Sequence, residues 1–132
     1  MYSGYLGYLD TQNHLNMDEM HKIHNDILKS IIDEDSKELY EDLVKQCTKY
    51  AEYRINWLLY NREEKINKDS YRSSCHDTLI IKFDILSRYI KSLGISTDWR
   101  EELGDVKLNP LNRKKIGDFA CYIAFINGLN AR

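Results

Sequence analysis

The most regular pattern of apolar positions in the chain lies between Asp69 and Leu93. Apolar side chains recur there at intervals of three and four residues, at Leu79, Ile80, Phe83, Leu86, Ile90 and Leu93. This spacing places them on one face of an α-helix, with most charged residues on the other face. Asp69 or Ser70 is the expected N-cap, and Gly94 is the expected C-terminal stop. The pattern therefore predicts a core helix over residues 69–93.

A second amphipathic pattern covers residues 17–32. Asn16 precedes it and Glu19 follows three residues later, which is the sequence signature of a capping box. The expected buried face consists of Met20, Ile23, Ile27 and Ile31. His21 and His24 lie beside this face, but a single pair of histidines cannot complete a metal coordination sphere. We expect a helix here and no metal site.

Residues 36–66 carry a nearly heptad pattern of apolar and aromatic positions. Asp35 and Glu38 form the expected capping-box pair at its start. A continuous helix of this length would span roughly 45 Å, which is more than a compact domain of this size needs. The excess length predicts dimerisation along the helix. The alternative is a bend, or a break near Tyr60–Asn61.

Two further helices are predicted in the C-terminal part of the chain. Residues 97–104 begin with a capping residue and end with glycine, so we expect a short helix there. Asn109–Pro110 supplies the N-cap and first position of a last helix that ends at Gly128, and Gly117 in this helix allows close approach of a neighbouring helix. The predicted fold class is all-α, a compact bundle of four main helices plus one short helix in a single domain over residues 16–132.

Residues 1–15 lack helical periodicity and form a predicted Tyr/Gly-rich N-terminal arm. Tyr2, Tyr5 and Tyr8 recur at every third position with glycines between them. Glycine makes such a segment flexible, and tyrosine offers an apolar ring with a polar tip. The arm either packs against the helical domain or presents its rings to a partner. We therefore treat the three tyrosines as candidate partner contacts.

The composition is that of an ordinary globular protein. Of 132 residues, 42% are hydrophobic and 30% are charged, and the formal net charge is −2. No apolar run approaches the roughly 20 residues needed to cross a bilayer, and no signal-peptide pattern is present. The three cysteines, Cys47, Cys75 and Cys121, form no metal or disulfide pattern. We expect a cytoplasmic protein with no membrane partner, no metal and no cofactor.

The charges are unevenly distributed along the chain. An acidic group, here called the acidic patch, comprises Asp33, Glu34, Asp35, Glu38, Glu41 and Asp42. A basic cluster follows much later, at Lys107, Arg113, Lys114 and Lys115. Such clusters are usually solvated helix ends, but an acidic patch can also mimic phosphates toward a protein partner. We treat the acidic patch, together with Arg100 as a surface anchor, as candidate partner-binding residues.

One local pair of residues, Arg72 and His76, could carry chemistry. They lie four residues apart, so both side chains project from one face near the start of the predicted core helix. An imidazole can act as general acid or base while a guanidinium holds a phosphate. The pair resembles the Arg–spacer–His motif of the HEPN ribonucleases, small all-helical domains whose spacer has four to six residues, whereas this spacer has three. The resemblance implies metal-independent RNA cleavage; the alternative is that His76 is a half-buried structural histidine.

The C-terminal half carries a second resemblance. The segments HDTLI, SRYI, DWREELGD and RKKIGDFACYIAFINGL resemble a family of uncharacterised small helical proteins. Members are carried by plasmids, phages and conjugative elements of Gram-positive bacteria, and the resemblance covers roughly residues 70–132. The resemblance implies that the protein comes from a mobile genetic element, but it implies no biochemical activity. Proteins of such elements often bind and block host defence complexes, as anti-CRISPR proteins do, or regulate the element's own transfer.

These observations leave two main functional hypotheses. The first is a non-enzymatic binding protein, expected to be a homodimer, that acts on a protein or nucleoprotein partner; it is favoured because no complete catalytic set can be assembled. The second is a HEPN-like ribonuclease that uses Arg72 and His76 on RNA. A third, weaker hypothesis is DNA binding through residues 113–115, which the negative net charge disfavours.

Overall fold

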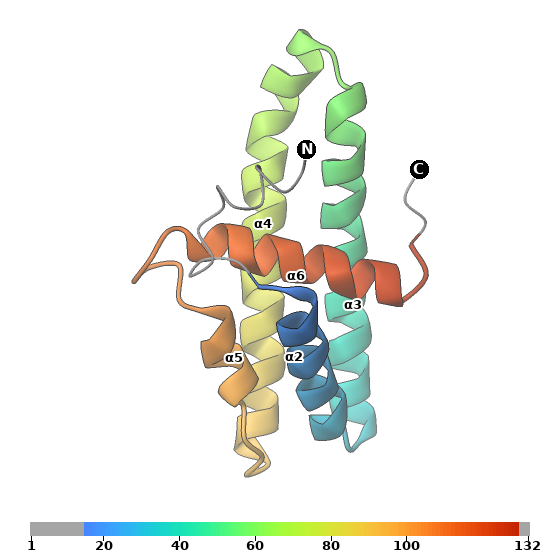
Figure 1. Cartoon of the computed structure of the whole chain (residues 1–132). Helices are drawn as coiled ribbons and strands as arrows, with labels where there is room; N and C mark the ends of the chain where they lie inside the picture. The colour runs from blue at the N-terminus through green and yellow to red at the C-terminus, as the bar shows by residue number, and fades with distance from the viewer. Residues whose placement is uncertain (1–14, 130–132) are drawn as a thin grey trace.

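The computed structural model describes residues 15–129, and within that range the chain is all-α (Figure 1). The α-helices are α2 (Met17–Ser30), α3 (Glu34–Asn56), α4 (Arg62–Ser92), α5 (Asp98–Leu103) and α6 (Asn112–Ile126), and a 3₁₀ turn, η2 (Trp57–Leu59), follows α3. Four of these helices are long and α5 has 6 residues, which confirms the predicted fold class. Over the described part of the chain, no helix combines the length and apolar character needed to cross a membrane.

α3 and α4 run antiparallel as a long hairpin, and α6 crosses both helices near their middle (Figure 1). α2 and α5 lie on one side of this crossing, beside the start of α3 and the end of α4. On the other side, the end of α3, η2 and the start of α4 project as a two-helix segment, here called the hairpin tip (residues 53–71). The helices that cover the hairpin therefore surround only part of its length.

The predicted continuous helix over residues 36–66 is wrong, and the alternative break near Tyr60–Asn61 is confirmed. α3 ends at Asn56, and the backbone of Tyr60 and Asn61 is extended. Asn61 then starts α4 as its N-cap: its Oδ1 accepts the Glu64 N–H at 2.8 Å, and Glu64 Oε1 accepts the Asn61 N–H at 2.9 Å. This capping box starts a new helix and places the beginning of α4 before Asp69, the N-cap predicted from the apolar stripe. The length argument for a dimer thereby loses its basis, and the homodimer stays a prediction.

The remaining helix ends agree with the sequence pattern to different degrees. Asn16 caps α2 and pairs with Glu19 as predicted. α3 is capped by Asp33, which accepts the Ser36 N–H at 2.8 Å, so the predicted Asp35 cap is wrong by two positions. The Asp33 cap prevails because Ser36, at the third helical position, bonds back to the Asp33 N–H.

The last helix begins slightly later than the sequence predicts. Asn109 Oδ1 accepts the Leu111 N–H at 3.1 Å, and the Asn109 carbonyl accepts the Asn112 N–H at 2.9 Å. Asn109–Pro110 thus forms a turn ahead of α6 instead of its cap and first residue. This turn satisfies the first N–H groups of α6 and brings Arg113 against α4.

The core lies where α6 crosses the hairpin. The largest fully buried side chains come from all five helices and include Ile27, Leu43, Phe83, Trp99 and Phe119. The Phe83 and Phe119 rings stack with their centroids 5.9 Å apart. Most of the predicted stripe on α4 is buried, but Leu93 at its end is 40% exposed. The predicted close approach at Gly117 is confirmed, since a Cβ there would lie 2.6 Å from the Tyr50 hydroxyl oxygen on α3.

Candidate functional site

A cleft of about 440 Å³ opens between α3, α4 and the start of α6, and it is here called the α3–α4–α6 cleft. Four cationic side chains line it: Arg54 from α3, Arg72 from α4, and Arg113 and Lys114 from α6. His76 and Tyr50 also line it, and among the described lining residues there is no carboxylate. The cleft therefore unites both residues of the Arg72–His76 pair with part of the predicted basic cluster.

His76 occupies the inner wall of this cleft. Its side chain is 4% exposed, and its ring meets the Tyr50 ring edge-on at 5.4 Å between centroids. Nε2 lies 2.7 Å from the backbone carbonyl oxygen of Arg113. A carbonyl only accepts hydrogen bonds, so Nε2–H is the donor. The imidazole thus fastens the start of α6 to α4.

The other nitrogen of His76 has a different environment. Nδ1 is buried and has no hydrogen-bond partner. Burial lowers the pKa of His76 below its ordinary value, an effect that the hydrogen bond to the Arg113 carbonyl only partly opposes. The neutral ring therefore dominates at neutral pH. Since Nε2 is occupied and Nδ1 is enclosed, neither nitrogen is within reach of a molecule in the cleft in this geometry.

Three of the four cations of the cleft, Arg54, Arg113 and Lys114, are paired with two carboxylates outside its lining. Arg54 Nη1 lies 3.0 Å from Asp118 Oδ1, and Lys114 Nζ lies 3.3 Å from Asp118 Oδ2. Arg113 Nη1 lies 3.2 Å from Asp77 Oδ1. These ion pairs orient the cationic groups without removing them from the cleft wall. The arrangement suits an anion that is met by several cations at once.

No cysteine is among the described residues that line the cleft. Burial raises the pKa of the Cys47, Cys75 and Cys121 thiols, which keeps them protonated. Across the described residues, no three side chains of the metal-ligating types His, Cys, Asp and Glu come together. The chemistry that this site offers is electrostatic attraction and hydrogen-bond donation.

The acidic patch lies on the first half of α3, away from the cleft. Asp33 is the α3 cap and accepts the Tyr89 hydroxyl at 2.7 Å, and this hydrogen bond is the main reason that its pKa is lowered. Asp42 pairs with Lys82. The remaining members, Glu34, Asp35, Glu38 and Glu41, are exposed. Two of the six candidate residues, Asp33 and Asp42, thus make contacts that hold the fold together, although Asp33 is exposed as well.

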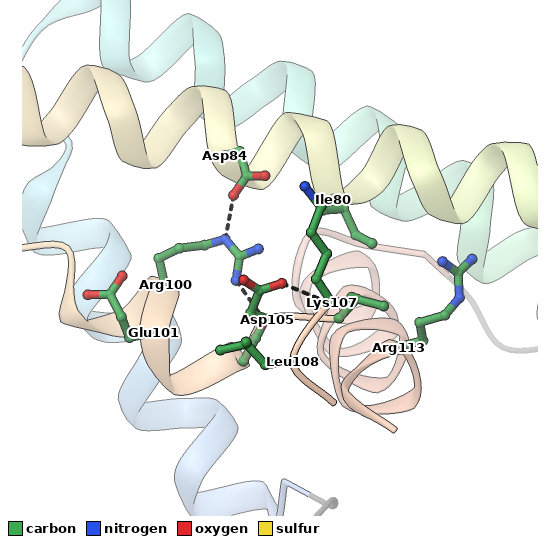
Figure 2. A pocket seen from close by; sticks show the side chains of 10 residues that line it. Ile80, Asp84, Arg100, Glu101, Asp105, Lys107, Leu108 and Arg113 are labelled. Atoms are coloured by element: carbon green, nitrogen blue, oxygen red, sulfur yellow. Dashed lines mark hydrogen bonds and ion pairs between the residues drawn. The ribbon is translucent and has the colours of Figure 1, made fainter. Parts of the chain in front are cut away.

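Arg100 lies in a second, larger cavity of about 740 Å³ beside α5 (Figure 2). Its Nε donates to Asp84 Oδ1 on α4 at 2.7 Å, and its Nη1 donates to the Gly104 carbonyl at 3.1 Å. The side chain is only 14% exposed. The predicted surface anchor therefore has its guanidinium engaged within the fold, where it joins α5 to α4. Tyr2, Tyr5 and Tyr8 lie outside the described residues.

Sequence reasoning missed Arg54 and Tyr50 as cleft residues, because both positions fall on the nearly heptad path within residues 36–66, which is typical of a helix face that packs against other helices. The signal that could have found them is the spacing of Tyr50 and Arg54, which lie four residues apart and so share a helix face. Their juxtaposition with Arg72 and Arg113 arises only from the packing of three helices. Comparisons of the chain with protein-family models, with curated proteins and with solved structures found no match.

Proposed function

We propose that the protein is a non-enzymatic binding protein that holds the phosphate backbone of a nucleoprotein partner's nucleic acid in the α3–α4–α6 cleft. The observation that carries this proposal is the convergence of Arg54, Arg72, Arg113 and Lys114 from three helices on one cleft. A guanidinium presents N–H groups in a planar fork that matches two phosphate oxygens. Nucleic-acid backbones are the common biological ligands that present several phosphates in a row.

The state of His76 supports binding over catalysis. A general acid or base must reach the proton that it transfers and must change charge near neutral pH. Here Nε2 is committed to the Arg113 carbonyl, and burial holds the pKa below its ordinary value. The ring serves instead to position Arg113, whose guanidinium lines the cleft.

The experiment uses a charge reversal in the cleft and a matched one outside it. Arg72→Glu and Arg88→Glu change the net charge equally and lie on the same helix, but Arg88 is not among the residues of the cleft. Binding of a fluorescein-labelled single-stranded RNA is measured by anisotropy at about 50 mM salt. We expect Arg72→Glu to weaken binding about tenfold or more and Arg88→Glu to change it less than about twofold. Equal effects of both variants, or no binding by the wild type, would contradict the proposal.

A second candidate is the HEPN-like, metal-independent ribonuclease. The observation that favours it is that Arg72 and His76 line the same cleft one helical turn apart. The test is incubation of 5′-labelled RNA with EDTA and either the wild type or His76→Gln, whose side-chain amide can still donate to the Arg113 carbonyl. Cleavage by the wild type that disappears in His76→Gln would establish the ribonuclease. Intact RNA with both proteins would leave binding as the function.

The proposal also names a class of nucleoprotein partner. The resemblance of residues 70–132 to proteins of mobile elements leads us to propose a host defence complex that contains RNA as the nucleoprotein, with inhibition as the consequence. Addition of the wild-type protein to such a purified complex is expected to reduce the nuclease activity of the complex. Addition of Arg72→Glu in its place is expected to leave that activity unchanged. Inhibition that survives Arg72→Glu would place the contact elsewhere, with the acidic patch as the next candidate.

A further inference from the structure

The hairpin tip carries a group of aromatic and lysine side chains that the cleft does not include. This aromatic–lysine cluster comprises Tyr53, Trp57, Tyr60, Lys65, Lys68 and Tyr71. It lies on the part of the α3–α4 hairpin that projects beyond α6 (Figure 1). Neither α2 nor α5 reaches this part of the hairpin, so the cluster is bordered by α3 and α4 themselves.

Tyr53 forms the centre of the cluster and the other rings form its rim. The Tyr53 side chain is 3% exposed, and its centroid lies 5.6 Å from Trp57, 6.1 Å from Tyr60 and 5.7 Å from Tyr71. Tyr71, by contrast, is 41% exposed, and Trp57 and Tyr60 are half-buried. The buried Tyr53 ring holds the two helices of the tip together. The exposed ring surfaces of the rim residues are not needed for this packing and remain open to a ligand.

The two lysines lie over the rings of this rim. Lys68 Nζ lies 5.2 Å from the Tyr71 centroid and 5.9 Å from the Tyr60 centroid, and Lys65 Nζ lies 5.3 Å from the Trp57 centroid. Exposed cation–π contacts of this kind contribute only about 0.5–1 kcal/mol. A lysine can therefore move aside for a flat ring that stacks on the tyrosine and then contact a phosphate next to it.

The cluster lies next to the α3–α4–α6 cleft along both helices of the hairpin. Tyr53 precedes Arg54 on α3, and Tyr71 precedes Arg72 on α4, so each helix carries a ring of the cluster next to a cation of the cleft. Adjacent residues on a helix advance by only about 1.5 Å along its axis and are turned by roughly 100° about it, so the rings and the cations project from neighbouring faces of the same helices. A strand whose phosphates lie in the cleft therefore has the rings of the tip beside it.

We propose that the aromatic–lysine cluster is a stacking platform for the unpaired bases of a single-stranded nucleic acid whose phosphates lie in the cleft. This inference rests on the proposed function and names the class of nucleic acid. Aromatic rings beside a cationic groove are the means by which proteins hold single strands, because every base has a flat face that can stack. A duplex has its base faces occupied by neighbouring base pairs. The lysines over the rings favour a polyanion over an apolar protein surface as the occupant.

The test compares three ligands and four proteins. The ligands are a fluorescein-labelled oligouridylate of about 12 nucleotides, an abasic strand with the same number of phosphates, and a duplex RNA of equal length. The proteins are the wild type, Tyr71→Ala, Tyr71→Phe and Phe125→Ala. Phe125 is the matched control because it is an aromatic residue of similar exposure, 43%, at the far end of α6.

We expect the wild type to bind oligouridylate more tightly than either the abasic strand or the duplex. Tyr71→Ala should weaken oligouridylate binding by about 5- to 100-fold, the effect of losing one base–ring stack, and should leave the abasic strand unaffected. Tyr71→Phe retains the ring and should bind as the wild type does. Phe125→Ala should also bind normally.

Tryptophan fluorescence gives an independent measurement in the unlabelled wild type. The chain has two tryptophans, and Trp99 is 2% exposed in the core, so quenching by a ligand reports on Trp57. Oligouridylate should quench this emission, and the abasic strand should not. Equal quenching by both strands would mean that the bases do not reach the rings.

The outcomes separate this inference from the proposed function. If oligouridylate and the abasic strand bind equally, and Arg72→Glu weakens both whereas Tyr71→Ala weakens neither, the stacking platform is overturned and the phosphate cleft stands. If no nucleic acid binds even at low salt, both are overturned. If Tyr71→Ala instead changes the molar mass measured by light scattering and not RNA binding, the cluster is a contact between copies of this chain, and the inference is also overturned.

Discussion

His76 acts at the scale of a single residue by joining two helices through one hydrogen bond. Its Nε2–H donates to the Arg113 carbonyl, so the ring determines where the first residues of α6 lie against α4. The same placement leaves Nδ1 buried without a hydrogen-bond partner, which makes a charged imidazole unfavourable in the folded protein. The residue that most resembles a catalytic group is thereby also a packing residue.

His76→Gln should reduce the pH dependence of stability. Because burial lowers the pKa of folded His76 below its ordinary value of 6.5, the unfolded chain binds a proton more readily. The contribution of His76 to the free energy of unfolding is therefore complete above the unfolded pKa and declines as the pH falls through it toward the lowered folded pKa. Urea midpoints at about pH 7.5 and about pH 5.5 should differ less in the variant than in the wild type.

Some pH dependence should remain in His76→Gln, since burial also lowers the pKa of His24, whose Nε2 lies 2.8 Å from the Tyr40 hydroxyl. A variant with the same pH dependence as the wild type would show that His76 is not held neutral by the fold.

At Gly117, α6 packs against Tyr50 of α3 with no room for a side chain. A Cβ added there would lie 2.6 Å from the Tyr50 hydroxyl oxygen and 3.2 Å from two ring carbons. Gly117→Ala would gain up to about 1 kcal/mol from helix propensity, but overpacking costs about 1–3 kcal/mol. We expect a net loss of about 1 kcal/mol in the free energy of unfolding, measured by urea denaturation.

The control for Gly117→Ala is the same change in a Tyr50→Phe background. Removing the hydroxyl eliminates the shortest contact, so the cost of the added methyl group should shrink. An equal cost in both backgrounds would indicate that the backbone of α6, and not the Tyr50 side chain, limits the space.

At the scale of elements, α2 and α4 begin with the same device in different surroundings. Asn16 with Glu19 and Asn61 with Glu64 form matching capping boxes. α2 buries Ile23 and Ile27 in the core soon after its cap. The first turns of α4 lie on the hairpin tip, and nearly all of the described side chains in those turns are exposed. Loss of the capping box should therefore affect the unfolding of the whole protein in α2, but only the local opening of the first turns in α4.

Asn16→Ala and Asn61→Ala should consequently differ in what they unfold. Each removes a cap worth about 1 kcal/mol. Asn16→Ala should lower the free energy of global unfolding by about that amount, whereas Asn61→Ala should mainly accelerate amide hydrogen exchange at the start of α4. Hydrogen exchange with urea denaturation measures both. Equal global losses would indicate that the tip unfolds together with the core.

At the scale of the whole molecule, the acidic patch and the cleft lie near opposite ends of α3. The exposed acidic residues Glu34 and Glu38 lie near its start and Arg54 lies near its end, roughly 24–30 Å away at the helical rise per residue. That separation is several times the Debye length of about 8 Å at physiological salt. A protein of net charge −2 can therefore still present a locally cationic cleft.

The double variant Glu34→Gln/Glu38→Gln should change RNA affinity less than about twofold at physiological salt, because screening separates the two regions. Fluorescence anisotropy with the same labelled RNA measures this. A gain as large as the loss caused by Arg72→Glu would mean that overall charge, and not the cleft, governs binding. Loss of capture of a protein partner by this variant would instead support the acidic patch as a contact surface.

The sequence by itself determined the helical class, the capping of α2 and most of the buried face of α4. These features depend on the 3.6-residue period and on hydrogen bonds within a few residues, which a local pattern records directly. The long helix over residues 36–66 was wrong because the chain leaves the α-helix at η2 and Tyr60, and the Asn61 cap then starts a new helix although the apolar pattern continues.

Only the tertiary structure decided the candidate site. Arg54, Arg72 and Arg113 lie on three different helices, and the crossing of α6 over the hairpin brings them to one cleft. That crossing depends on the stacking of Phe119 on Phe83 and on the small Gly117 beside Tyr50. Local periodicity specifies which face of each helix is buried, but the point at which two helices meet follows from how their side chains fit together.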